Sequence, residues 1–409
     1  MIPLALDEVA QLGRLERAPG VAEATGVQVD SRRILPGDLF VAVNDSGAGF
    51  VGDALGRGAT AALVPEDGFV ALAALGGAVR DRSSARVVGI TGSAGKTSTK
   101  DILAAVCSPK ARTVAAEASF NNEIGVPLTL CRLERDTEIC ILELSMRGLG
   151  QIAELCAYAK PHVGVITTIG PAHVELLGSI DAIVQAKAEL VEALPSGGTA
   201  IVPDDFPVTR TDLEVVRLGK PEARVADGRT LIRWDDREIA FDFTARHQAR
   251  NAIAALHAAR AVGIEPADRV DVEFSRWRGE EVPLPGGGLL INDAYNANPL
   301  SMRAALEHLV AQADGRRTVA ILGEMAELGP GSPSYHEEIG TVAKNLGVDV
   351  VIGVGELARN YEPGGWSPDA TAATDMARNV IRPGDCVLVK GSRAAGLEIV
   401  AEALSTVPA

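Results

Sequence analysis

The feature that most constrains the fold is a repeated alternation of apolar strand patterns with helical patterns between residues 87 and 202. The strand-like runs are short and continuously apolar, whereas the segments between them carry apolar residues at helical spacing. Strands that are apolar on both faces are typical of a parallel sheet covered by helices on each side. The alternating segments are 87–90, 97–107, 139–144, 151–159, 163–169, 180–194 and 199–202. We therefore predict an α/β domain here.

Two further regions flank this central series. Residues 1–82 hold short apolar runs separated by turn signals such as Pro36-Gly37, and predict a small mixed domain. Beyond a polar stretch at 204–245 and a helix at 250–262, a second series of short strands and helices predicts another parallel sheet. We expect an α/β protein of three domains: a small mixed N-terminal domain at 1–82, a P-loop-type parallel-sheet domain at 83–275 and a Rossmann-like α/β domain at 276–409.

Composition narrows the possible partners and environment. The 39 basic and 54 acidic residues give a net charge of −15, which argues against nucleic acid as a partner. No segment reaches the roughly 18 consecutive apolar residues of a membrane span, and the first residues do not resemble a secretory leader, so we expect a cytoplasmic protein. The five cysteines are scattered and none forms a C-x-x-C pair. They are predicted to be reduced core residues.

A glycine-rich loop gives the strongest functional signal. Residues 89–99 read GITGSAGKTST and stand between an apolar strand and a helix. Backbone N–H groups of such a loop bind phosphate at a helix N-terminus, the lysine contacts the terminal phosphates, and the next hydroxyl can bind Mg²⁺. The strict P-loop spacing fails by one position, because Ile90 stands where the first glycine should be. A simple turn with an exposed Lys96 is the alternative, but strand, loop and helix together favour a phosphate site.

Glu143 and His173 follow two other apolar strands of the central series. Taken alone, each is typical of a surface carboxylate or a structural histidine. In an open parallel sheet, however, ligands bind at the carboxyl ends of the strands. The glycine-rich loop, Glu143 and His173 are therefore predicted to converge at one edge, where they could hold Mg²⁺ and a nucleotide.

Lys187 lies within the apolar stripe of the helix predicted at 180–194. The stripe recurs at helical periodicity and consists of Ile180, Ile183, Val184, Leu190, Val191 and Leu194. Burial disfavours an ammonium group, so the pKa of Lys187 should fall and its neutral amine should become available for chemistry. The alternative is a lysine whose stem lies on the apolar surface while its charge reaches water.

The loop Thr91-Gly92-Ser93-Ala94-Gly95-Lys96-Thr97 resembles the nucleotide signature of the Mur ligases, the ATP-dependent amide-forming family of peptidoglycan synthesis. Several further motifs occur in an order and spacing that also resemble this family, and they extend the resemblance over nearly the whole chain. These motifs are residues 30–32 (DSR), 36–42 (PGDLFVA), 121–128 (NNEIGVPL), 293–299 (DAYNANP), 322–329 (LGEMAELG) with His336, and 389–393 (VKGSR).

The resemblance implies an activity with its cofactors and substrates. The chain would use ATP and Mg²⁺ to join D-Ala-D-Ala to the terminal carboxylate of UDP-N-acetylmuramoyl-tripeptide through an acyl phosphate. Both acceptor and amine are small molecules, and a monomer is expected. Because acyl phosphates hydrolyse, the third domain should close over the second and exclude water, with residues 263–292 as the hinge.

The resemblance also implies roles for residues at matching positions. Catalysis would rest on Lys96, Glu143, His173 and Lys187, and the metals would be held by Thr97, Glu143, His173 and Lys187, the last as a carbamate. ATP would be bound by Thr91, Gly92, Ser93, Ala94, Gly95, Lys96, Thr97, Ser98, Asn251, Arg278, Asp293 and Tyr295. The nucleotide-sugar substrate would be bound by Ser31, Arg32, Asn121 and Asn122.

Three stretches depart from the family's pattern. Residues 47–50 read GAGF, Gln248 stands in place of the usual asparagine, and the segment at 199–247 is short. They leave open a related ligase that joins a different amine to a different carboxylate. A nucleotide-binding regulator without amide synthesis is a further alternative, disfavoured because it has no chemical need for His173 and Lys187.

Overall fold

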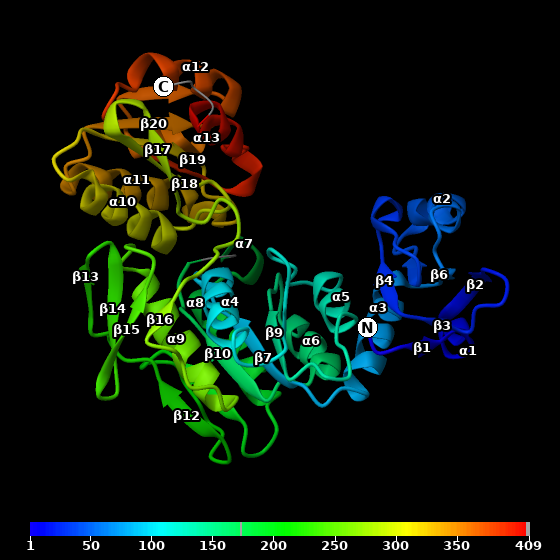
Figure 1. The fold of residues 1–409 in the computed structure, drawn as a ribbon. Coiled ribbons are helices and arrows are strands. Elements are labelled where there is room, and N and C mark those ends of the chain that lie inside the picture. The colour runs from blue at the N-terminus through cyan, green and yellow to red at the C-terminus, as the bar shows by residue number, and fades with distance from the viewer. Residues whose placement is uncertain (172–173, 406–409) are drawn as a thin grey trace.

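The computed structural model describes residues 1–171 and 174–405. Its sheets form three α/β regions that follow one another along the chain, coloured blue, cyan to green, and yellow to red in Figure 1. The central region lies between the N-terminal and C-terminal regions. The predicted α/β class is therefore confirmed.

The N-terminal region is a small mixed sheet with short helices, as predicted. Its strands are β1 (Leu4–Ala5), β2 (Gly13–Arg17), β3 (Glu23–Ala24), β4 (Gly26–Gln28), β5 (Asp38–Val41) and β6 (Ala61–Pro65). Its helices are α1 (Leu6–Val9), α2 (Val51–Gly56) and α3 (Gly68–Asp81), with 3₁₀ turns η1 (Ala10–Leu12), η2 (Ser31–Arg33) and η3 (Asp45–Phe50). The mixed sheet has the order β2-β6-β5-β4, in which only β2 runs antiparallel to its neighbour, while β1 and β3 pair in a separate two-stranded antiparallel sheet.

The central region is built on a six-stranded parallel sheet. The strands, in spatial order, are β12 (Glu214–Arg217), β11 (Thr199–Val202), β10 (Val163–Ile166), β7 (Arg86–Thr91), β9 (Ile139–Glu143) and β8 (Thr113–Ala115). The helices are α4 (Lys96–Cys107), α5 (Gly125–Leu130), α6 (Gln151–Ala159), α7 (Val174–Leu177), α8 (Ile180–Glu192) and α9 (Gln248–Ala261). Helices α4 and α9 pack together over one face, and α6 and α8 cover the other. The alternation of strand and helix patterns therefore correctly predicted a parallel sheet covered by helices on both faces.

Helix α3 joins the N-terminal region to the central region through a shared core. Leu72 and Val79 on α3 belong to one buried cluster with Val126 on α5. Arg80 is also buried, and its Nε donates to the carbonyl of Ala159 at the end of α6, at 3.0 Å. The two regions are thus packed against each other rather than linked by a free segment.

The polar stretch predicted at 204–245 is in fact rich in strands. Besides β12, it forms β13 (Ala223–Ala226), β14 (Arg229–Trp234) and β15 (Arg237–Phe241), which make a small sheet with β16 (Arg269–Val270). Ile232 and Trp234 are buried on alternate positions of β14, while the residues between them are more exposed. This alternation is a strand signal that the many charged neighbours conceal.

The strands predicted in the C-terminal region pair in parallel, as expected, and an additional edge strand that was not predicted, β17 (Glu280–Leu284), makes the sheet mixed. In spatial order its strands are β17, β18 (Gly288–Asp293), β22 (Cys386–Lys390), β19 (Thr318–Gly323), β20 (Val350–Val354) and β21 (Gly365–Ser367). Only β17 is antiparallel, because the short turn η4 (Pro285–Gly287) returns the chain directly onto β18. The helices are α10 (Pro299–Ala313), α11 (Ser332–Asn345), α12 (Ala370–Val380) and α13 (Glu398–Ser405), with turns η5 (Gly329–Gly331), η6 (Leu357–Tyr361) and η7 (Arg393–Ala395).

The cysteines and the helices agree with two further expectations. All five cysteines are buried and free of disulfides. Within residues 1–171 and 174–405, no helix is long and apolar enough to cross a membrane.

The contact between α3 and α5 gives a stability prediction. A Cβ added at Gly76 on α3 would lie 2.8 Å from the backbone Cα of Pro127 on α5, so the helices would have to separate. We expect Gly76→Ala to destabilise the protein by about 1–3 kcal/mol, measured as a lower midpoint in urea unfolding followed by circular dichroism. Gly52→Ala, at a site with open space, is the control. An unchanged midpoint for Gly76→Ala would show that the two helices tolerate separation.

Candidate active site

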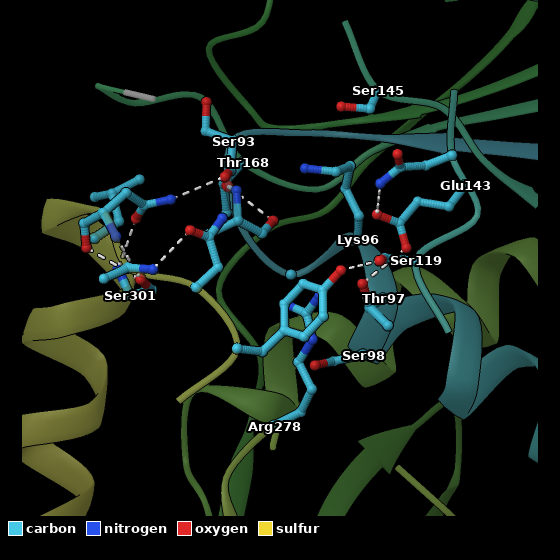
Figure 2. Close-up of a pocket in the computed structure, with 18 of the residues that line it drawn as sticks. Ser93, Lys96, Thr97, Ser98, Ser119, Glu143, Ser145, Thr168, Arg278 and Ser301 are labelled. Atoms are coloured by element: carbon cyan, nitrogen blue, oxygen red, sulfur yellow. Dashed lines mark hydrogen bonds between the residues drawn. The ribbon is translucent and has the colours of Figure 1, made fainter. Parts of the chain in front are cut away.

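A cavity of about 970 Å³ opens at the carboxyl end of the central sheet. One wall consists mainly of central-region residues that follow β7, β8, β9 and β10 or lie at the start of α9. The other consists of C-terminal residues, including Arg278 before β17 and residues that follow β18, β19 and β22. Figure 2 shows Lys96, Thr97, Glu143 and Arg278 around this space, with Ser301 of α10 on its far side. The cavity therefore lies where the central and C-terminal regions meet.

Most of the predicted site residues line this cavity. They are Ser93, Ala94, Gly95, Lys96, Thr97, Ser98, Asn121, Asn122, Glu143, Asn251, Arg278, Asp293 and Tyr295. Thr91 and Gly92 are buried at the end of β7 and do not line it, and Lys187 is buried on α8. Ser31 and Arg32 belong to the N-terminal region. His173 lies outside the described residues.

Two glycines give the nucleotide loop its shape. Gly95 precedes α4 with φ +83°, a left-handed conformation that other residues rarely adopt. A Cβ at Gly95 would also collide with the side-chain oxygen of Asn251 on α9, and one at Gly92 would collide with Thr167. The backbone thus turns tightly at the start of α4, where N–H groups point toward any bound anion.

The segment after β10 supports the nucleotide loop from one side. The N–H of Ser93 donates to the Thr168 carbonyl at 2.9 Å, and the N–H of Ala94 donates to the Thr168 hydroxyl at 3.0 Å. The Ser93 hydroxyl donates to the Gly170 carbonyl at 2.9 Å. These bonds fix the first half of the loop before α4 begins.

Lys96 is the cation closest to the loop. Its Nζ donates to the carbonyl of Gly92 at 2.8 Å, so the side chain folds back over the loop. Burial lowers the pKa of Lys96, the carboxylate of Glu143 partly opposes this shift, and Arg278 adds to it. A lysine that lies over the loop in this way can contact the terminal phosphates of a nucleotide.

Glu143 and Thr97 form an oxygen-rich pair beside Lys96. The Thr97 hydroxyl donates to Glu143 Oε2 at 2.8 Å, and Asn121 Nδ2 donates to Glu143 Oε1 at 2.8 Å. Within the described residues, no group of three or more His, Cys, Asp or Glu residues could hold a metal. A carboxylate and a hydroxyl next to a phosphate loop nevertheless suit Mg²⁺, which takes few protein ligands and completes its shell with water and phosphate oxygens.

Lys187 is buried as the apolar stripe predicted, with 2% of its surface exposed. Burial lowers its pKa well below the ordinary value, and the nearby cation Lys96 lowers it further. Both effects favour the neutral form of the amine, which lies near Lys96 of the nucleotide loop. Only an uncharged amine can react with CO₂ to form a carbamate, so this position suits that modification.

Helix α9 contributes amides at the outer end of the loop. Asn251 Nδ2 donates to Gln248 Oε1 at 2.7 Å, and Gln248 Nε2 lies 3.4 Å from the Ser98 hydroxyl. Both amides are buried. Gln248, although longer than the usual asparagine, thus remains within reach of α4.

The C-terminal wall carries a cation, a ring and an ion pair. The Arg278 guanidinium lies 4.1 Å above the centre of the Tyr295 ring. The Tyr295 hydroxyl is hydrogen-bonded to the Ser119 hydroxyl of the central region. Asp293, at the end of β18, accepts a bond from Lys390 Nζ at 2.6 Å. The wall can therefore offer both a cation and a carboxylate to a nucleotide.

Asn298 joins the two walls directly. Its Oδ1 accepts the N–H of Ser301 and caps α10, while its Nδ2 donates to the carbonyl of Ser93 in the nucleotide loop at 3.0 Å. This bond links the C-terminal region to the nucleotide loop. Sequence reasoning missed Asn298 as an interdomain contact, although its place before Pro299 marks it as a helix cap.

Two of the predicted substrate residues, Asn121 and Asn122, lie on the loop between β8 and α5, and the other two, Ser31 and Arg32, lie in the N-terminal turn η2. Asn122 Oδ1 accepts the N–H of Gly125, the first residue of α5, at 3.0 Å. Arg33, beside Ser31 and Arg32 in η2, reaches Glu117 of the same loop at 3.3 Å. The loop thus extends from the N-terminal region to the cavity. Ser31 and Arg32 themselves do not line the cavity.

Comparisons with known proteins agree with this site. The Mur ligase middle domain matches residues 90–259, and the Mur ligase glutamate ligase domain matches residues 277–393. The UDP-N-acetylmuramoyl-tripeptide–D-alanyl-D-alanine ligase of Mycobacterium tuberculosis is 35% identical, over 92% of this chain and 91% of that protein. The ligase of the same name from Escherichia coli is 30% identical over 99% of each chain.

Solved structures give the same result. The crystal structure of MurF from Acinetobacter baumannii has a TM-score of 0.87 at 27% identity, over 98% of this chain and 99% of that one. The MurF ligase from Thermotoga maritima in complex with ADP has a TM-score of 0.81 at 26% identity, over 93% and 97%. Sequence, fold and site together show that this chain belongs to the Mur ligase family.

Proposed function

We propose that this chain is an ATP-dependent ligase that joins D-alanyl-D-alanine to the terminal carboxylate of UDP-N-acetylmuramoyl-tripeptide, in peptidoglycan precursor synthesis. The observation that carries the proposal is the single cavity in which the nucleotide loop faces the Glu143–Thr97 pair and the C-terminal Arg278. Similarity over nearly the full length to ligases named for this reaction supports it. The products are the amide, ADP and phosphate.

The reaction has two balanced steps. A carboxylate oxygen of the tripeptide first attacks the γ-phosphorus of ATP, the bond from that phosphorus to the bridging oxygen breaks, and ADP leaves. The amine nitrogen of D-Ala-D-Ala then attacks the acyl carbon of the acyl phosphate. The carbon–nitrogen bond forms, the carbon–oxygen bond to phosphate breaks, and the nitrogen gives a proton to solvent.

The protein's contribution to phosphoryl transfer is orientation and charge. Lys96 and the N–H groups at the start of α4 stabilise the negative charge of the phosphates. Thr97 and Glu143 would hold Mg²⁺, which neutralises charge on the transferred phosphoryl group when it is bound. Asn121 keeps the Glu143 carboxylate in place through its bond to Oε1. Together these groups favour attack by a carboxylate that is itself negative.

A second metal position would be formed by His173 and a carbamate on Lys187. Carbamylation turns the buried amine into an anion, so a side chain that Lys96 would repel as an ammonium group is attracted by Lys96 as a carbamate. An oxygen ligand at this position also suits Mg²⁺. The low pKa of Lys187 favours the neutral amine that the modification needs.

The remaining residues divide between nucleotide and acceptor. Residues 91–98 with Asn251, Arg278, Asp293 and Tyr295 would bind ATP, because Asp293 can accept from ribose hydroxyls and Arg278 can bind phosphate. Ser31 and Arg32 would bind the UDP end of the acceptor, and Asn121 and Asn122 its peptide end. The loop between β8 and α5 contacts Arg33 through Glu117 and Glu143 through Asn121, which supports an acceptor that runs from the N-terminal region to the cavity.

This division assigns one role to each region. Residues 1–82 would bind the UDP-sugar, residues 83–275 would bind ATP, and residues 276–409 would bring the amine and complete the nucleotide site. Contacts such as that of Asn298 with Ser93 support the cooperation of the last two. We propose a monomer that acts in the cytoplasm on small molecules.

Phosphate release tests the proposed reaction. The purified chain should release phosphate from ATP only with Mg²⁺, UDP-N-acetylmuramoyl-tripeptide and D-Ala-D-Ala all present, and mass spectrometry should detect the matching amide. Each component is omitted in turn as a control. ATP binding without phosphate release in the complete mixture would contradict the assignment, and a different amine or carboxylate that restores release would favour a related ligase.

Lys187→Ala tests the carbamate. We expect amide synthesis to fall about 10- to 100-fold or more, because the second metal would lose a direct ligand, and even the loss of a supporting outer-shell group costs this much. ADP binding, measured by calorimetry, should persist because Lys187 does not line the cavity. Lys344→Ala on exposed α11 is the matched control and should keep full activity. Unchanged synthesis by Lys187→Ala would exclude the proposed role.

The lowered pKa of Lys187 also predicts a dependence of stability on pH. In the unfolded chain this lysine stays protonated up to about pH 10, whereas in the folded chain it is neutral above its lowered pKa. The unfolded state therefore binds more protons in this window, and stability should rise with pH. In CO₂-free buffer, Lys187→Met should show a weaker rise between pH 7 and 9 in urea unfolding. Equal slopes for both proteins would mean that Lys187 is protonated in the fold.

A further inference from the structure

Behind the wall of the cavity, Lys100 and Asp101 form a buried ion pair that the proposed reaction does not use. Lys100 Nζ lies 2.8 Å from Asp101 Oδ1, and the two side chains are 4% and 7% exposed. Both belong to α4, one turn beyond Lys96, and neither lines the cavity. Burying a charge pair costs desolvation, which further hydrogen bonds can offset.

Lys100 holds the base of the loop that leads to Asn121. Its Nζ donates to the carbonyls of Ala116 at 2.9 Å and Ala118 at 3.0 Å. Ala118 has φ +46°, an uncommon conformation for alanine that the bond helps to hold. Three residues later, Asn121 donates to Glu143. Lys100 therefore fixes the start of the loop that orients the metal-binding carboxylate.

Asp101 holds the segment that crosses to the C-terminal region. Its Oδ2 accepts the N–H of Ser275 at 2.9 Å, and its Oδ1 accepts the Ser275 hydroxyl at 3.2 Å. Lys100 Nζ lies 3.4 Å from the same hydroxyl. Three residues later, Arg278 enters the cavity and lies over Tyr295. The ion pair thus contacts the segments that carry both walls.

We propose that Lys100 and Asp101 are positioning residues that set the spacing between the Asn121 loop and the Arg278 segment. The first turn of α4 then binds phosphate. Lys100 and Asp101, in its second turn, hold the Asn121 loop and the Arg278 segment on either side of that phosphate. Disturbing the pair should weaken nucleotide binding and phosphoryl transfer although neither residue touches the nucleotide. The inference rests on the proposed function for the identity of that nucleotide.

Lys100→Met tests the proposal in the full-length protein. Calorimetry with ADP and Mg²⁺ should show an affinity about 3- to 30-fold lower, and kcat should fall about 10- to 100-fold, because small displacements of oriented groups are costly. The KM for the UDP-linked acceptor should rise less than kcat falls, because its UDP end would be held by the N-terminal region and only its peptide end by Asn121 and Asn122. Lys100→Arg keeps the cation and should recover part of the ADP affinity. Lys110→Met, at an exposed lysine, is the matched control.

A folded Lys100→Met variant with wild-type ADP affinity and kcat would overturn the proposal. If this variant does not fold, Ser275→Ala decides, because it removes only the hydroxyl on the crossing segment. Lower ADP affinity of Ser275→Ala would support the proposal, and wild-type affinity with wild-type kcat would overturn it. ADP binding does not require amide synthesis, so a wild-type protein that makes no amide would reject the proposed function and leave this test intact.

Discussion

The site depends on the tight backbone turn between β7 and α4. Gly95 takes a left-handed conformation with Asn251 packed where a side chain would be, and Thr168 holds the first half of the loop. The turn is therefore a product of packing from α9 and from the segment after β10. The start of α4 lines the cavity because these neighbours hold the turn, so the nucleotide site depends on the packing of the whole central region.

The rest of the site is assembled from segments that are distant in sequence. Tyr295 contacts Ser119, Asn298 contacts Ser93, and Arg33 contacts Glu117. Each contact links the central region to one of its neighbours. An acyl phosphate needs protection from water between the two steps, and a cavity with walls from two regions provides it when they stay together.

Sequence patterns predicted the parts of this site that depend on local order. The nucleotide loop lies between a strand and a helix, Glu143 ends a strand, and the apolar stripe around Lys187 shows its burial. Lys100 and Asp101 gave no such signal, because their burial depends on Ser275, which lies 174 residues beyond Asp101. The strand β14 was missed for another reason, since its alternation is hidden among charged residues. Sequence reasoning therefore missed contacts between residues that are distant in the chain, and it missed a short strand whose alternating pattern is hidden by charged residues.

Three buried lysines differ in the charged groups that surround them. Lys390 lies 2.6 Å from Asp293, and Lys100 lies 2.8 Å from Asp101, so each has a carboxylate as its partner. Lys187 instead lies near another cation, Lys96. Burial and this neighbouring cation both lower the pKa of Lys187 and so favour the neutral amine, the only form that can take up CO₂. Among the described residues, the position of carboxylates, rather than burial alone, thus distinguishes the lysine proposed to become an anion from Lys100 and Lys390.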